Sequence, residues 1–270
     1  MGAERPRADA LPLAAGELRW LIPAPAADPL AIGVRARGLI GRALKALHCR
    51  LDPDASACAG CAFRAECLYG TSFEPPEGVV LPGFGRVGAL PHAWSLAVDI
   101  RGLGCVLRLR LVGFECANAA HWAEAVARAF TAQPLAQLDG AALPMSLHWR
   151  AITPMRLRYR GRTPRAEELP QAIAHATARR AKMLAAMHGI ASPTARLPEP
   201  RVEDAAWIEA ERFRARTQSV QPMGGWVTTI HWPEATPEAW RPWLGIVRFL
   251  GLGRQANFGF GRLIALEGEG

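Results

Sequence analysis

The stretch "GLGRQANFGFGRL", residues 251–263, places four glycines, two arginines and two phenylalanines within thirteen positions. The segment before it, residues 237–250, carries apolar residues at the spacing of a helix. These residues are Trp240, Trp243, Leu244, Val247 and Leu250. The segment "FGRLIAL", residues 260–266, is typical of a strand. We therefore predict that a glycine-rich loop, residues 251–261, joins a helix to the last strand of a sheet.

Two interpretations of this loop stay open from its own residues. Glycine lets backbone N–H groups approach an anion closely, and arginine supplies a planar set of donors for phosphate. The spacing Gly251-x-Gly253-x5-Gly259-x-Gly261 is neither a dinucleotide fingerprint nor a P-loop, and the loop contains no lysine. The other interpretation is a helix C-cap followed by a tight turn.

The composition favours a polyanionic partner. The chain has 270 residues, half of them apolar, which allows two compact domains. Its net charge is +8, and Lys45 and Lys182 are its only lysines, so nearly all of its positive charge is arginine. Arginine makes bidentate phosphate contacts and stacks on bases, whereas lysine acts more as a point charge. A basic excess of this kind is typical of proteins that contact nucleic-acid phosphates.

The sequence predicts a cytoplasmic protein without a membrane partner. No run of about eighteen apolar residues occurs, so no transmembrane helix is expected. The first twenty residues lack the continuous apolar region of a signal peptide. In a reducing compartment, the six cysteines are expected to be thiols or metal ligands instead of disulfides.

The order of the expected elements predicts an α+β fold with two ferredoxin-like (βαββαβ) domains in tandem. Residues 1–145 form the first, with a helix at 33–50 and a Cys-rich loop at 49–69, and residues 146–270 form the second. Expected strands of the first domain are 16–22, "WSLAVDI" and "LGCVLRLRLVG", with a helix that Asn118 caps. The second has strands at 145–161, 211–218, 225–232 and 260–266, and a helix with Pro170 near its start and Gly189 after its end. A proline-bounded segment, 134–144, is the linker candidate.

Arginines alternate with apolar residues along three expected strands. Alternation places them on one face of each strand: Arg108 and Arg110; Arg156, Arg158 and Arg160; Arg212, Arg214 and Arg216. One interpretation is that these faces are only the solvated side of half-buried strands. Three such strands beside an arginine-bearing glycine loop instead predict a basic cleft.

Four cysteines form a separate pattern. Cys49, Cys58, Cys61 and Cys67 lie within nineteen residues and include one C-x2-C pair. Tetrahedral zinc takes four thiolates, and an iron–sulfur cluster uses the same ligands. The alternative is that these thiols are small buried side chains without a metal. A structural zinc site is therefore an expectation, with these four residues as its ligands.

Five segments of the chain follow one another in this order: "RARGLIGRALKALHC", "CAGCAFRAECLYGTSFEPP", "RRAKMLAAMHG", "RFRARTQSVQPMGGWVTTI" and "WLGIVRFLGLGRQANFGFGRL". Together they resemble the CRISPR-associated RAMP endoribonucleases that process precursor crRNA. The arginine-rich character is similar to the type IV branch. The resemblance implies binding of CRISPR repeat RNA and metal-independent cleavage by the ribose 2′-hydroxyl, which leaves a 2′,3′-cyclic phosphate and a 5′-hydroxyl. It also implies that the mature crRNA stays bound and that other CRISPR effector subunits are partners.

The same resemblance suggests the site residues. Many family members use a histidine base, and His48 at the end of the first helix is the candidate by position. On a helical wheel His48 falls beside the apolar stripe, so we interpret it as a partly buried structural residue. Arg35, Arg50 and Arg254 are expected to stabilise the charge of the transition state. Further residues expected to contact RNA are Arg37, Arg42, Arg156, Arg158, Arg160, Arg212, Arg214, Arg216, Gly251, Gly253, Gly259 and Gly261.

Two other classes of protein fit the same residues. A noncatalytic RAMP subunit that only holds crRNA would carry the same basic sheets and glycine loop. A zinc-dependent interaction module would need only the cysteines, with the arginines as a solvated surface. The first would leave free repeat RNA uncut, and the second would show no tight, salt-sensitive RNA binding.

Overall fold

The computed structural model describes residues 12–23, 28–52, 54, 58, 60–75, 77–88, 90–102, 104–130, 133–140, 143, 145–214 and 219–266. These residues form two four-stranded antiparallel sheets, one in each half of the chain. The first sheet lies between residues 15 and 140, and the second between residues 148 and 265. None of the helices in these ranges combines the length and apolar character that a bilayer crossing requires.

The first half has the ferredoxin-like order. Its elements are β1 (Ala15–Pro23), α1 (Pro29–His48), α2 (Leu68–Ser72), β2 (Val79–Leu81), β3 (Gly85–Val87), β4 (Trp94–Arg101), β5 (Gly104–Val112), α3 (Phe114–Ala117), α4 (Ala119–Ala129) and β6 (Gln133–Gly140). The sheet order is β4-β5-β1-β6, and every neighbouring pair is antiparallel. The short hairpin β2–β3 stands apart from this sheet.

The second half repeats that order. Its elements are β7 (His148–Ala151), η1 (Ala166–Glu168), α5 (Leu169–Met187), β8 (Arg201–Ile208), β9 (Glu211–Arg214), β10 (Ser219–Pro222), β11 (Gly225–His231), η2 (Glu238–Trp240), α6 (Arg241–Leu250), η3 (Ala256–Phe258) and β12 (Leu263–Ala265). The sheet order is β12-β7-β11-β8. The prediction of two ferredoxin-like domains is confirmed.

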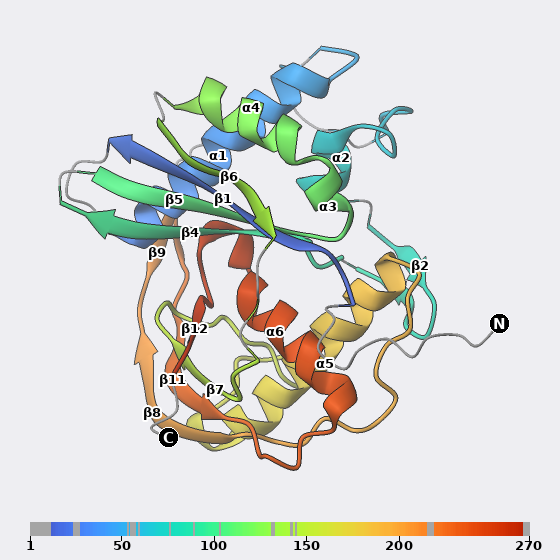
Figure 1. The fold of residues 1–270 in the computed structure, drawn as a ribbon, viewed down its shortest axis with the longest axis vertical. Coiled ribbons are helices and arrows are strands. Elements are labelled where there is room, and N and C mark those ends of the chain that lie inside the picture. Colours follow the sequence, from blue (N-terminus) through green and yellow to red (C-terminus); the bar gives the residue numbers. More distant parts are fainter. Residues whose placement is uncertain are drawn as a thin grey trace.

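Each sheet has its own core. Ile40 and Leu44 of α1 pack with Trp94 and Trp122 over the first sheet, and all four side chains are fully buried. Figure 1 shows α1 and α4 on one side of this sheet, with α5, α6 and the second sheet on its other side. Helix α6 is buried from Trp243 to Leu250, because it covers the second sheet and also contacts β5.

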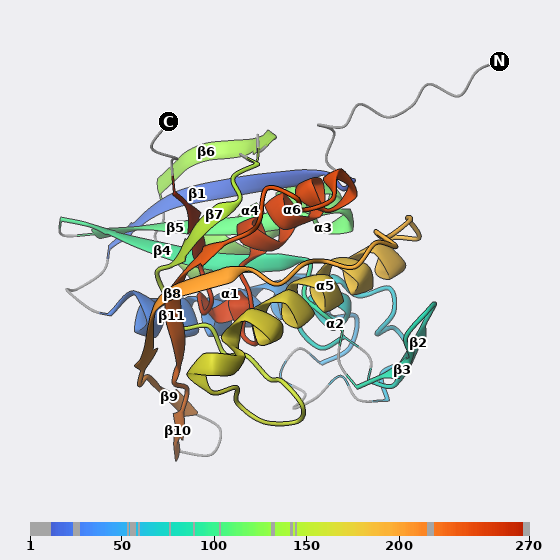
Figure 2. The same cartoon turned by 90° about the horizontal axis from the view of Figure 1, so that it is seen from below.

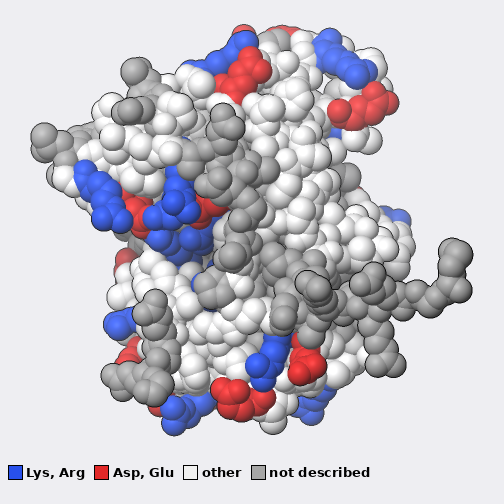
Figure 3. All heavy atoms as spheres, in the orientation of Figure 1, with Lys and Arg blue, Asp and Glu red and all other residues white. Residues whose placement is uncertain are grey.

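An ion-pair network of strand residues lies where the halves meet. The buried Glu17 carboxylate accepts from Arg110 at 2.9 Å and Arg108 at 2.9 Å, and Arg110 also donates to the Phe249 carbonyl at 2.9 Å. Burial alone would raise the pKa of Glu17, but the charges and hydrogen bonds of these arginines lower it. On the face in Figure 3, basic groups gather over this sheet with acidic atoms among them. Arg108 and Arg110 thus form ion pairs within the protein, which corrects the expectation that they line a basic cleft.

Several sequence-based boundaries need correction. The predicted linker 134–144 contains β6, an edge strand that tolerates Pro134 because its outer edge needs no ladder partner. The predicted strand 145–161 is regular only over β7 and continues as isolated bridges. The helix predicted at 33–50 is α1, which begins at Pro29 behind the Asp28 cap and ends at His48.

The segment predicted as a sheet strand at 211–218 is part of a separate hairpin. Among the described residues, strands β9 and β10 pair only with each other, and in Figure 2 this hairpin extends away from the second sheet. Its place in the sheet is taken by β8, which pairs with β11. The side chains of β8 are mostly exposed, so its sequence shows no apolar alternation that would have predicted it.

Candidate functional site

A cavity of about 730 Å³ lies between α5, residues 88–92 and the glycine-rich loop. Five arginines and two histidines line it, and we call it the basic cavity. They are Arg156, Arg158, Arg179, Arg180, Arg254, His92 and His175. In Figure 2 the β2–β3 hairpin, which precedes residues 88–92, lies beside the C-terminal end of α5. Met183 of α5 packs against this hairpin, which fixes one wall.

The glycines of the loop serve its own backbone geometry. Gly251 caps α6 with a φ of 85°, as the C-cap interpretation expects. Gly253 has a φ of 96°, and a Cβ there would lie 2.9 Å from the Arg156 carbonyl oxygen. A Cβ on Gly261 would lie 1.8 Å from the Leu252 oxygen. The glycines, Gly259 included, let the loop adopt the positive φ angles of its tight turns. A direct approach of the loop backbone to RNA stays a prediction.

This packing brings Arg254 against Arg156. The Arg254 amide donates to the Arg156 carbonyl at 2.9 Å, and the exposed Arg254 side chain reaches the cavity. Burial, and then the charge of Arg254, lowers the pKa of Arg156. Arg156 donates to the Gln255 side chain. Among the described residues neither arginine has a carboxylate within ion-pair distance, so this part of the cavity attracts an anion.

His92 presents one ring nitrogen to the cavity in a defined state. Its Nδ1 lies 2.8 Å from the Ser72 carbonyl oxygen, so Nδ1 carries the proton. Burial, aided by the charges of Arg37 and Arg180, lowers the pKa of His92 to about 4. The ring is therefore neutral near pH 7, and Nε2 is an acceptor. No hydrogen-bond partner for Nε2 occurs in the described part of the chain.

Arg180 is a deeply placed cation beside His92. Its Nη2 donates to the His92 carbonyl at 3.3 Å, and burial lowers its pKa to about 10, so it stays charged near neutral pH. Its Nε has no partner among the residues that the structure describes. Arg180 lines the cavity, and no described carboxylate lies within ion-pair distance of it, so its charge is suited to a phosphate.

Arg37 of α1 lies close enough to this site for its charge to act on His92. Its guanidinium lies 4.3 Å from the ring centroid of Phe258 and 5.0 Å from that of Phe73. Gly33, one turn earlier, packs so tightly that a Cβ would lie 2.5 Å from the Phe258 carbonyl oxygen. The contact holds α1 against η3, which is part of the glycine-rich loop.

The other predicted residues of α1 face away. Arg35 follows Gly33 by about 200° around the helix, and both Arg35 and Arg42 are exposed. Helix α1 extends about 22 Å from Gly33 to its end at His48, at 1.5 Å per residue, and Arg50 lies beyond that end. It pairs with Glu66 at 3.1 Å. The structure therefore does not bring Arg35, Arg50 and Arg254 together.

His48 is partly buried at that far end, as its helical position predicted. Its ring centroid lies 4.6 Å from that of His121, in an edge-on arrangement. Burial, and then the charge of His121, lowers the pKa of His48. Its place in the fold is separate from the basic cavity, and its catalytic role stays a prediction.

The remaining predicted arginines differ in placement. Arg158 lines the cavity and donates to the Gly161 carbonyl at 2.8 Å. Arg160 is exposed over the ring of Tyr159, 5.1 Å from its centroid. Arg212 and Arg214 are in β9, which is described only as backbone, and Arg216 lies outside the described residues.

The four cysteines precede α2 and share one neighbourhood. Burial, then the charge of Glu74, raises the pKa of Cys58, and the neighbouring Cys67 and Cys49 thiols add to this effect. The Cys67 thiol donates to the His48 carbonyl at 3.7 Å. Within the described ranges, no three Cys, His, Asp or Glu side chains converge closely enough to hold a metal. The zinc site stays a prediction.

Sequence reasoning did not select four residues of the cavity: His92, His175, Arg179 and Arg180. His92 lies in a connection without periodicity, so no local pattern distinguishes it. The pair Arg179 and Arg180 sits in "RRAKM", and its adjacent arginines near the helix end were the available signal.

Residues 150–263 match the family model of the CRISPR-associated endoribonuclease Cas6, and residues 16–132 match a model described as an N-terminal domain, AF_1859_N. Among solved structures, a Thermus thermophilus Cas6 product complex has a TM-score of 0.54 and 17% identity, covering 94% of this chain and 99% of that chain. An RAMP protein described as binding different RNA substrates has a TM-score of 0.54 and 12% identity, covering 94% and 100%. Comparison with curated protein sequences gives no match.

The tandem ferredoxin-like domains are a fold that the chain shares with these Cas6 and RAMP structures. The chain is a Cas6-like protein, which confirms its resemblance to the CRISPR-associated endoribonucleases that process precursor crRNA. The type IV branch stays a prediction.

Proposed function

We propose that this protein binds CRISPR repeat RNA in the basic cavity and cleaves precursor crRNA without a metal ion. The ribose 2′-hydroxyl attacks the adjacent phosphate, which leaves a 2′,3′-cyclic phosphate and a 5′-hydroxyl. The family match supports the substrate, and two of the similar structures are described as product and substrate-mimic complexes. The mature crRNA stays bound, because the arginines that hold the phosphates hold the product equally.

The observation that carries this proposal is the unneutralised charge of the cavity. Arg156 and Arg254 approach each other without a described carboxylate between them, and Arg180 adds a further charge to the cavity lining. A scissile phosphate gains negative charge in the transition state, and preorganised donors aimed at that charge lower the barrier. Arg254 and Arg156 are the residues we assign to this task, with Arg180 as a further donor.

His92 is the proposed proton acceptor. Its Nε2 takes the proton of the 2′-hydroxyl while the 2′-oxygen bonds to phosphorus and the bond from phosphorus to the 5′-oxygen breaks. A proton from solvent completes the 5′-hydroxyl. A pKa of about 4 makes the free ring a weak base. The phosphates of bound RNA would offset the charges of Arg37 and Arg180 and so raise the pKa of His92. A general base works best when its pKa is near the working pH.

Single-turnover cleavage of a labelled repeat RNA in EDTA tests the proposal. The expected result is a cut with a cyclic phosphate end, and none with a single 2′-deoxy substitution at the scissile nucleotide, which should still bind. Cleavage of the deoxy substrate, or a requirement for added Mg²⁺, would show that this mechanism is wrong.

A second candidate is a RAMP subunit that holds crRNA without cutting it. It is favoured by one observation, the separation of Arg35 and Arg50 from Arg254. The same EDTA assay separates the two functions, because this subunit would bind the repeat with steep salt dependence and leave it intact.

A further inference from the structure

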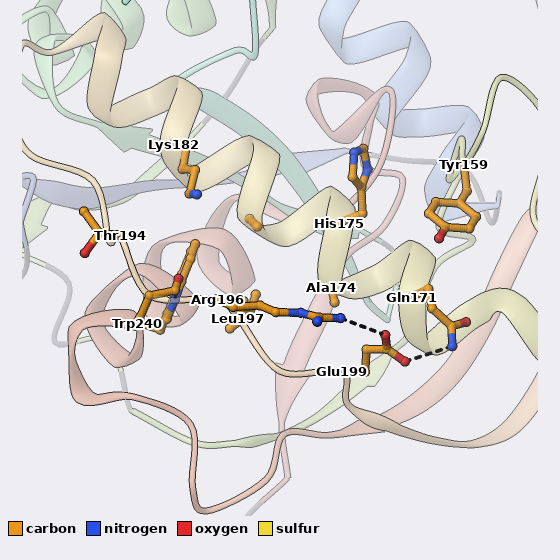
Figure 4. A pocket seen from close by; sticks show the side chains of 12 residues that line it. Tyr159, Gln171, Ala174, His175, Lys182, Thr194, Arg196, Leu197, Glu199 and Trp240 are labelled. Carbon is orange, nitrogen blue, oxygen red and sulfur yellow. Dashed lines mark hydrogen bonds and ion pairs between the residues drawn. The ribbon is translucent and has the colours of Figure 1, made fainter. Parts of the chain in front are cut away.

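A second cavity, of about 460 Å³, lies on the neighbouring side of α5. Figure 4 shows its lining side chains, which come from α5, from residues 194–199, from Tyr159 and from Trp240. We call it the α5 side pocket. Residues 194–199 and α5 form its opposite walls, and Trp240 lies at its base with its indole N–H bonded to the Ala195 carbonyl at 2.9 Å.

The lining chemistry suits a nucleotide. Tyr159 and His175 stand edge to face, with ring centroids 6.0 Å apart, at one end of the pocket. Lys182 supplies positive charge at the other end, where its ammonium lies 5.9 Å from the ring centroid of Trp240. The Arg196 guanidinium lies in the middle, 3.7 Å from the Glu199 carboxylate (Figure 4). Gln171 also donates to Glu199, at 2.8 Å. Aromatic rings stack on any base, and an amide beside a carboxylate offers both donor and acceptor atoms to a base edge.

The pocket is continuous with the basic cavity through one residue, His175, which lines both. At 100° per residue from Gln171, Lys182 and His175 fall within about 40° of Gln171, Arg179 falls at about 80°, and Arg180 falls on the opposite side of α5. His175 and Arg179 are exposed on the ridge between the two sides. A strand that leaves the basic cavity over this ridge therefore meets the side pocket within one or two nucleotides.

We propose that the α5 side pocket binds one unpaired nucleotide from the single-stranded flank of the RNA held in the basic cavity. This inference rests on the proposed function. The base stacks on Tyr159 and His175, its edge meets Gln171 and Glu199, and Lys182 contacts a phosphate. Because RNA sequence is read mainly from unpaired bases, this pocket selects the position of the flank.

The test is a binding scan with abasic nucleotides. Each nucleotide of the flank of a repeat hairpin is replaced in turn by an abasic one, and affinity is measured for wild type and Tyr159→Leu. In wild type, one abasic position should weaken binding about tenfold, the usual effect of losing one stacked base. In Tyr159→Leu, the same position should have no further effect, because the stacking partner is already gone.

A matched control is Phe114→Leu, since Phe114 also stacks on a histidine, His188, at 4.9 Å but lies in the first half of the chain. It should retain the full effect of the abasic position. Thermal unfolding checks that Tyr159→Leu keeps its fold, because Tyr159 packs partly against the core, and Gln171→Ala serves as a second variant. If no abasic position lowers the affinity of the wild-type protein, while the hairpin is still bound and cut, the proposed subsite is wrong and the proposed function stands. If wild type binds no hairpin, both fall.

Discussion

Arg254 and Arg156 are joined by a backbone hydrogen bond of 2.9 Å that brings two like charges to one wall of the basic cavity. The bond forms because Gly253 adopts a φ of 96° directly before Arg254. The charge arrangement of the site thus depends on a backbone conformation that residues with a Cβ rarely adopt.

We expect Gly253→Ala to destabilise the protein by at least about 1–2 kcal/mol, because its Cβ would meet the Arg156 carbonyl oxygen at a positive φ. The rate of RNA cleavage should fall as well, because the position of Arg254 depends on this turn. Chemical denaturation measures the change. Gly38→Ala is the control, since a Cβ there meets nothing within 4 Å in the middle of α1 and should be neutral or stabilising by about 0.5–1 kcal/mol. Equal stability of the two variants would contradict the role given to Gly253.

Arg254→Ala and Arg156→Ala should each slow single-turnover cleavage by a factor on the order of 10², the usual cost of removing one transition-state donor. Arg128→Ala is the control, because Arg128 is exposed on α4 and pairs only with Glu124 there. Arg35→Ala and Arg50→Ala belong in the same series. If these two lose more activity than Arg254→Ala, the sequence-based trio is right and the cavity assignment is wrong.

His92 should make the stability depend on pH. Its pKa is about 4 in the folded protein against an ordinary value of 6.5, so the unfolded chain binds the proton first as the pH falls between these values. Stability should therefore drop by about 2 kcal/mol from pH 7 to pH 5 on account of this residue. His92→Gln, which can still donate to Ser72, should lack this component in denaturation curves at the two pH values. Identical pH dependence in both proteins would mean that His92 titrates normally.

The same variant tests proton transfer. His92→Gln should bind the repeat hairpin as wild type does and cleave it far more slowly, with the pH dependence of the rate altered. His48→Ala is compared beside it. A folded His48→Ala protein that binds RNA but no longer cuts it would assign the base to His48 instead.

The cysteine cluster predicts zinc, and elemental analysis of the purified protein decides the point. If Cys49, Cys58, Cys61 and Cys67 hold zinc, about one equivalent should be present, and Cys61→Ser should lower the melting temperature more than the cleavage rate. Cys105→Ser is a control for loss of a buried thiol, because Cys105 is fully buried in β5. Metal-free protein of full stability would exclude the site.

Periodicity along the chain predicted the helices and most of the strands, in their order along the sequence. Trp240, Trp243, Leu244, Val247 and Leu250 are all buried as their spacing predicts. Pro170 opens α5, and Gly189 follows its end with a φ of 65°. These features depend on neighbouring residues only, so a sequence shows them. β8 was not recognised, because its mostly exposed side chains show no apolar alternation, and β6 was assigned to the linker because prolines bound that segment.

Tertiary structure alone decided which arginines face the cavity. Arg108, Arg110 and Arg156 look alike in sequence, each alternating with apolar residues. The first two meet Glu17 from a strand far away in the chain, whereas Arg156 meets a loop that brings another arginine. Whether a charge is neutralised or left to bind an anion depends on the groups that folding places within a few ångströms of it, and residue spacing along the chain does not contain that information.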